Sequence, residues 1–104
     1  MSDAYAHVTE YTVCSLPESN INYMSYAITV AYRGRGLWAV TRHRMCLDKD
    51  GDWGWESIPS ERTDEWLAEN RFTRAEALRL AKLEAPKVVV NGFTVADVLA
   101  RGER

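Results

Sequence analysis

The chain has 104 residues, 46% hydrophobic and 27% charged, so its composition excludes a disordered chain and suits one domain with a modest core. The net charge of −2 excludes nucleic-acid binding driven by bulk positive charge. No apolar run approaches the roughly 20 residues of a membrane-spanning helix, and residues 1–5 lack the basic and apolar parts of a secretory signal. We therefore expect a single cytoplasmic domain over residues 1–104.

Two strands and a hairpin turn are predicted in the first third of the chain. β-Branched and aromatic residues favour a strand over residues 8–16, which ends before Pro17. From residue 24 to residue 33, apolar side chains alternate with small or polar ones, and this period of two predicts a strand with one buried face. Gly34 and Gly36 follow at once and predict a hairpin turn.

Two more strands are predicted before residue 57. Residues 37–47 are rich in aromatic and β-branched side chains and predict a third strand. The Asp-Gly pair within residues 48–52 lies between two strand-like runs and predicts a second hairpin. Residues 53–56 then predict the returning strand, on which Trp53 and Trp55 point to the same face.

Helical signals begin after Pro59. Thr63, followed by two acidic residues, predicts the N-cap of a short helix, and Thr73 with Glu76 forms the pattern of a capping box that opens the main helix. The main helix is rich in alanine, which allows close approach to a sheet, and we expect it to stop at Pro86. A short strand over residues 88–90, a turn and a final short helix over 94–99 complete the chain. The predicted fold class is α+β, an antiparallel three- to four-stranded meander packed against one main helix, with short additional helices.

Neither the carboxylates nor the cysteines form a recognised metal site. Asp48, Asp50 and Asp52 alternate as calcium ligands do, but Trp53 and Pro59 stand where an EF-hand loop needs glycine and glutamate. We therefore expect a solvated acidic turn, with a weak cation site as the alternative, and no cofactor. Cys14 and Cys46 have no metal-ligand spacing and are expected to be reduced; a disulfide between them remains the alternative if the first and third strands pair.

Histidine chemistry is not expected either, and we predict that the protein is not an enzyme. His43 and Cys46 are three positions apart, which places them on opposite faces of a regular strand, and no nucleophile motif is present. The acidic side chains of residues 56–69 lie mostly at predicted helix starts, where they offset the helix dipole.

The predicted sheet combines aromatic and arginine side chains, and this combination is typical of protein interfaces. If the main helix covers only one sheet face, some aromatic residues remain exposed on the other. We therefore expect the binding of a protein partner, or self-association, through these residues: Tyr32, Arg33, Arg35, Trp38, Arg42, Arg44, Trp53 and Trp55. The alternative is a nucleic-acid-binding module that uses the basic hairpin 33–44, although the acidic stretch 48–69 is a competing partner for these arginines.

The second half of the chain resembles a group of known proteins. Residues 53–99, with Pro59–Leu67, Arg71-Phe72-Thr73 and Val90-Asn91-Gly92, are similar to small uncharacterised proteins of actinobacterial bacteriophages. This resemblance implies a phage-encoded accessory protein and assigns no site residue. Residues 47–53 and 72–77 also resemble, in their order, the arm-binding domains of phage integrases, which read DNA with a three-stranded sheet. The long connection over 59–71 and Glu56 on the last strand depart from that pattern.

Overall fold

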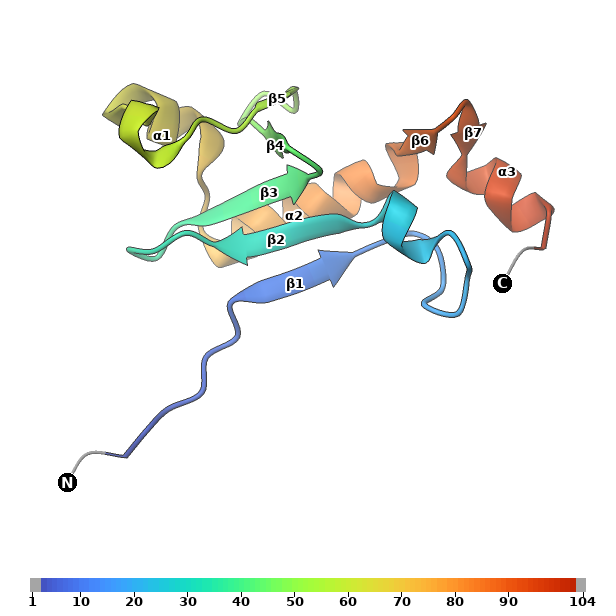
Figure 1. Ribbon diagram of the computed structural model, residues 1–104, viewed down its shortest axis with the longest axis horizontal. Coiled ribbons are helices and arrows are strands. Elements are labelled where there is room, and N and C mark those ends of the chain that lie inside the picture. Colours follow the sequence, from blue (N-terminus) through green and yellow to red (C-terminus); the bar gives the residue numbers. More distant parts are fainter. Residues whose placement is uncertain (1–2, 103–104) are drawn as a thin grey trace.

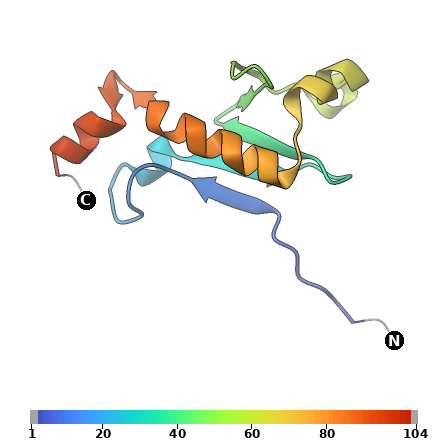
Figure 2. The ribbon, with the colours of Figure 1, turned by 180° about the vertical axis from the view of Figure 1, so that it is seen from behind.

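A computed structural model describes residues 3–102 and has the predicted α+β class. Five strands form an antiparallel meander in the sheet order β1-β2-β3-β4-β5 (Figure 1). Helix α2 lies across β2 and β3 on one face of this sheet (Figure 2). The strands are β1 (Glu10–Val13), β2 (Ile28–Tyr32), β3 (Trp38–Arg42), β4 (Met45–Leu47) and β5 (Trp53–Trp55).

The second half of the chain is mostly helical, as its capping signals predict. The helices are α1 (Asp64–Asn70), α2 (Arg74–Glu84) and α3 (Val95–Ala100), with 3-10 turns η1 (Tyr23–Tyr26), η2 (Pro59–Glu61) and η3 (Ala85–Lys87). Strands β6 (Val89–Val90) and β7 (Phe93–Thr94) form a small second sheet. No helix within residues 3–102 is long and apolar enough to cross a membrane.

Threonine side chains cap all three helices. Thr63, Thr73 and Thr94 each accept a hydrogen bond from the backbone N–H three residues later. The box predicted at Thr73 is only half formed, because the Glu76 carboxylate binds Arg79 rather than returning to the N-cap. Among the helices that the structure describes, only α3 has a complete box, in which Asp97 accepts from the Thr94 N–H.

The core lies between α2 and the sheet face that Val30 and Val40 share. These two side chains are cross-strand neighbours and are fully buried. Helix α2 faces them with Ala77 and Ala81, also fully buried, and the small alanine side chains allow the helix backbone to approach the sheet closely. Cross-strand alternation therefore assigns odd-numbered positions of β3, such as Thr41, to the opposite sheet face.

The predicted strand over residues 24–33 begins only at Ile28. The preceding residues form the 3-10 turn η1 because the Asn20 carbonyl accepts from the Tyr23 N–H and the Asn20 side chain accepts from the Asn22 N–H. The Tyr26 hydroxyl donates a hydrogen bond to the Phe93 carbonyl at 2.7 Å, which joins this turn to the second sheet. Of the alternating residues 24–33, therefore, those before Ile28 do not form a strand.

The predicted strand over residues 37–47 is two strands. The chain reverses at His43 and Arg44, so that Arg42 pairs with Met45 and the meander has five strands rather than three or four. His43 adopts a φ of 57°, a region that non-glycine residues seldom occupy. The turn carries no glycine, which is why its sequence resembles an uninterrupted strand.

Candidate functional site

Trp53 and Trp55 lie on β5, on the sheet face that α2 covers. Their cross-strand partners are Leu47 and Met45, so the register places all four side chains on that face. Trp53 is half-buried, whereas Trp55 is 73% exposed. The two tryptophans therefore share a face, as alternation predicts, and one of them is presented to solvent.

A groove of about 460 Å³ separates β3–β5 from the C-terminal end of α2. We call it the groove, and it is lined mainly by apolar surface together with several charged groups: Arg42, His43, Met45, Trp53, Glu84, Lys87, Val88 and Val89. Its size falls within the range of about 300–1,000 Å³ that ligand pockets occupy. Trp55 stands beside it as the cross-strand neighbour of Met45.

Arg42 forms the polar wall of the groove. Its guanidinium donates one hydrogen bond to the Ser25 carbonyl at 2.9 Å, and within residues 3–102 nothing accepts from its buried Nε. On the opposite side, Lys87 forms an ion pair with Glu84 at 2.9 Å. The groove walls thus carry an excess of positive charge, and the guanidinium keeps donor capacity that the described residues leave unused.

Tyr32 and Trp38 belong to a different part of the sheet. Trp38 is only 7% exposed and packs in the core, with its ring centroid 5.3 Å from that of Tyr32. The Tyr32 hydroxyl accepts a hydrogen bond from the Gly36 N–H and so supports the turn between β2 and β3. The structure therefore does not bring these two aromatics together with Trp53 and Trp55.

The four arginines of the basic hairpin are also separated. Arg33 and Arg35 lie at the β2–β3 turn, whereas Arg42 and Arg44 lie at the β3–β4 turn, which is at the other end of β3. Alternation additionally places Arg33 and Arg42 on opposite sheet faces. These residues do not form one basic patch.

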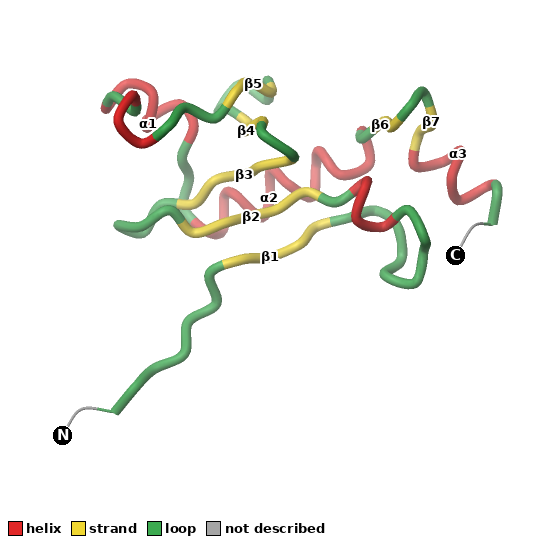
Figure 3. Tube along the Cα trace, viewed as in Figure 1, coloured by secondary structure: helices red, strands yellow, loops and turns green. Residues whose placement is uncertain are grey.

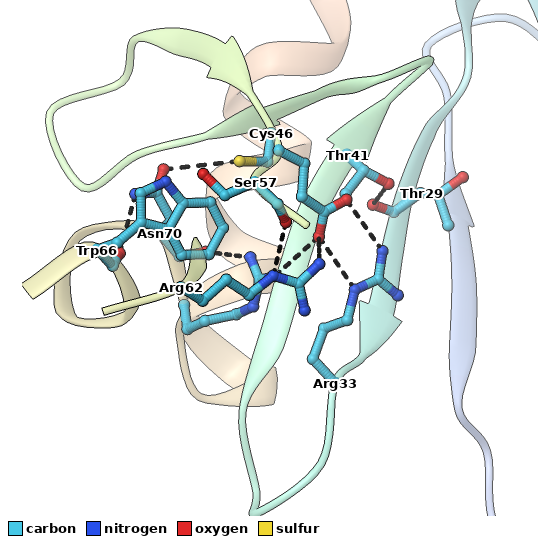
Figure 4. Close-up of polar contacts among 10 residues, drawn as sticks. Thr29, Arg33, Thr41, Cys46, Ser57, Arg62, Trp66 and Asn70 are labelled. Atoms are coloured by element: carbon cyan, nitrogen blue, oxygen red, sulfur yellow. Dashed lines mark hydrogen bonds and ion pairs between the residues drawn. The ribbon is translucent and has the colours of Figure 1, made fainter. Parts of the chain in front are cut away.

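Arg33 instead joins a partly buried cluster on the sheet face opposite α2. The Glu56 carboxylate accepts hydrogen bonds from three arginines, at 3.1 Å from Arg33, 3.5 Å from Arg62 and 2.8 Å from Arg71. Figure 4 labels Arg33 and Arg62 of this set and marks their polar contacts with dashed lines. We call these four residues the Glu56 cluster. One arginine of the basic hairpin 33–44 therefore pairs with a carboxylate of the acidic stretch 48–69.

Arg71 reaches the cluster because its backbone lies beside β3. Phe72 and Trp38 exchange two backbone hydrogen bonds, of 2.8 and 2.9 Å, so the link between α1 and α2 runs like a short strand. Phe72 is part of the core, and alternation sends Arg71 to the opposite face, where 1% of its side chain is exposed. Its guanidinium also lies over the Trp66 ring of α1, at 4.7 Å.

The Glu56 cluster favours the charged form of its carboxylate. Burial raises the pKa of Glu56, but the hydrogen bond and charge of Arg33, with the charges of Arg71 and Arg62, outweigh burial and lower the pKa below its ordinary value. Burial lowers the pKa of Arg71 and the Glu56 charge opposes this effect. Through its three ion pairs, the cluster links the end of β2 and the segments on both sides of α1 to one carboxylate.

The acidic turn and the two cysteines were the other candidates for a metal site or a disulfide. Within residues 3–102, no three histidine, cysteine or acidic side chains are grouped to hold a metal ion. Asp48 instead accepts hydrogen bonds from the N–H groups of Asp50 and Asp52, which closes the acidic turn. Cys14 and Cys46 are free thiols. Cys14 follows β1 and Cys46 lies on β4, and both β2 and β3 lie between these two strands.

Several residues of these sites escaped sequence reasoning. The packing of α2 on the sheet brings Lys87, Val88 and Val89 near β4 and β5. No local sequence pattern therefore predicts the groove. Arg62 and Arg71 are 6 and 15 residues from Glu56, and no periodicity links them. Comparisons of the chain with protein-family models, with curated proteins and with solved structures find no significant match.

Proposed function

We propose that the protein is a small, non-enzymatic interaction protein that binds a partner protein through the groove and the neighbouring Trp55. The observation that carries this proposal is an apolar groove bordered by an exposed tryptophan and a partly exposed arginine. Exposed tryptophan and arginine side chains are the residue types most enriched at the energetic centres of protein interfaces. The resemblance of residues 53–99 to phage proteins supports an accessory role in a host cytoplasm.

The chemistry of the groove favours a particular kind of partner segment. Met45, Trp53 and Val88 offer apolar surface, which suits a large apolar side chain. Arg42 and Lys87 stand on either side, so a neighbouring carboxylate gains attraction, while Glu84 already neutralises part of the charge of Lys87. The partner segment is therefore an apolar residue flanked by aspartate or glutamate.

A selection from a displayed library of random peptides tests this proposal. We expect the immobilised protein to enrich peptides that carry an apolar residue next to an acidic one. Trp55→Ser should weaken binding of the enriched peptides by more than about tenfold, since a central interface tryptophan contributes about 2 kcal/mol or more. Arg42→Gln should weaken binding of acidic peptides in particular.

Two matched controls separate the groove from general surface effects. Ile21→Ser removes an equally exposed apolar side chain that does not line the groove, and Arg79→Gln removes an arginine of α2 outside it. Both should leave binding unchanged. Enrichment that survives Trp55→Ser and Arg42→Gln would contradict the proposal. A short DNA duplex that binds with steep salt dependence would replace it with nucleic-acid recognition.

A further inference from the structure

Residues 3–9, which we call the arm, precede β1, and all of them except Thr9 lie beyond the end of its partner strand β2. All seven side chains are exposed, including Tyr5 at 79% and Val8 at 59%. The Thr9 carbonyl accepts a hydrogen bond from the Tyr32 N–H at 2.8 Å, after which β2 gives way to a turn. The arm therefore leads away from the sheet as an extended chain (Figure 3).

The outer edge of β1 is open. Of the strands described within residues 3–102, only β2 pairs with β1. The bond from Tyr32 to Thr9 sets the alternation: Thr9 and Tyr11 turn their backbone groups toward β2, whereas Glu10 and Thr12 turn theirs toward the open side. An exposed edge of this kind is a template for another strand.

We propose that two copies of the chain pair antiparallel along residues 3–13 and so join their two sheets across a twofold axis. A strand that pairs antiparallel with its own copy is self-complementary, which is the requirement of a twofold interface. The arm, about 23 Å long at roughly 3.3 Å per residue, then covers β1 of the second copy. Glu10 faces an arm residue in this arrangement, so the two Glu10 charges do not meet.

The alternation also fixes which side chains meet. The backbone N–H and C=O groups of even-numbered residues face the open edge in both copies. Even-numbered residues of one copy therefore pair with even-numbered residues of the other, and odd with odd. Tyr5 of the second copy therefore lies on the same sheet face as Tyr11. On that face a second groove of about 440 Å³ is lined by His7, Val8, Thr9, Tyr32, Trp38 and Arg74. The pairing places an exposed tyrosine beside an apolar hollow that one copy leaves open.

The test is the mass in solution, measured by light scattering after size exclusion over a range of concentrations. We expect about twice the 11.9 kDa of one chain. Thr12→Pro removes an N–H that faces the open edge and leaves the bonds between β1 and β2 intact, so it should raise the dimer dissociation constant by more than about tenfold. Thr12→Val is the matched control and should remain a dimer.

Tyr5→Asp provides a second variant that cannot unfold the sheet, because the arm lies outside it. This variant should also shift the equilibrium to the monomer, with an unchanged far-UV circular dichroism spectrum. A chain that stays monomeric up to about 1 mM, or a dimer that survives both Thr12→Pro and Tyr5→Asp, would overturn the inference. Because the arm and the groove with Trp55 lie at opposite sheet edges, a dimer lost only in Trp55→Ser would overturn it too and would assign self-association to the groove.

Discussion

Among substitutions that keep the size of the side chain, we expect Glu56→Gln to lower the free energy of unfolding most. The variant removes the negative charge that three arginines share, and Arg71 is left with 1% of its side chain exposed and no counter-charge from this carboxylate. Removing one partner of a buried ion pair costs about 3–5 kcal/mol. Because Glu56 keeps 18% exposure and water screens Arg33 and Arg62, we expect about 2–3 kcal/mol of lost stability here.

Urea unfolding followed by tryptophan fluorescence measures this loss. A loss of 2–3 kcal/mol corresponds to a fall in Tm of roughly 10–20 °C for a domain of this size. Glu61→Gln is the matched control, since it makes the same chemical change at an exposed position of the same acidic stretch, and it should cost less than about 0.5 kcal/mol. Equal unfolding midpoints for Glu56→Gln and Glu61→Gln would refute the reasoning.

The pH dependence gives an independent check on the same carboxylate. The folded state holds the pKa of Glu56 below its ordinary value of 4.5, so between these two pKa values the unfolded chain binds more protons. The stabilising contribution is therefore complete above pH 4.5 and is lost as the pH falls through the folded pKa. The stability difference between the natural chain and Glu56→Gln should stay constant from pH 7 to about 5 and shrink below that. A difference that persists unchanged at pH 3 would assign the effect to packing.

Two further substitutions test the core and the contact between the sheets. Ala81→Leu inserts a large side chain where α2 approaches the sheet and the residue is fully buried, so it should cost about 1–3 kcal/mol in urea unfolding, whereas Lys82→Leu on the exposed side should cost far less. Tyr26→Phe removes the hydrogen bond to the Phe93 carbonyl, which should cost about 1 kcal/mol and speed amide exchange in β6 and β7; unchanged exchange there would show that the hydroxyl is not what joins them.

The features that sequence reasoning recovered are those with a local cause. Thr63 and Thr73 cap their helices because a hydroxyl can reach an N–H three residues away, a contact that depends on no distant part of the chain. Gly51 supplies the positive φ of the acidic turn, and this preference is also local. Such signals establish the order and type of most elements.

The features that it missed depend on distant contacts. Residues 24–26 alternate like a strand, yet Tyr26 binds a carbonyl 67 residues away and the segment belongs to a 3-10 turn. The reversal at His43 needs a positive φ that only the completed sheet stabilises. Likewise, the charge pattern indicated pairing between basic and acidic stretches, but which three of ten arginines meet Glu56 is decided by tertiary packing.

Because Cys46 is buried, the rate of its reaction with a thiol reagent depends on local opening of the structure. This thiol is 1% exposed, its Sγ lies 3.6 Å from the Asn70 Oδ1 of α1, and burial, with a smaller contribution from the Glu56 charge, raises the pKa of Cys46. A thiol reagent reacts with the thiolate, so it modifies Cys46 only after β4 and α1 separate. In a Cys14→Ser background, the rate at which the reagent labels Cys46 therefore measures how often this part of the molecule opens under native conditions.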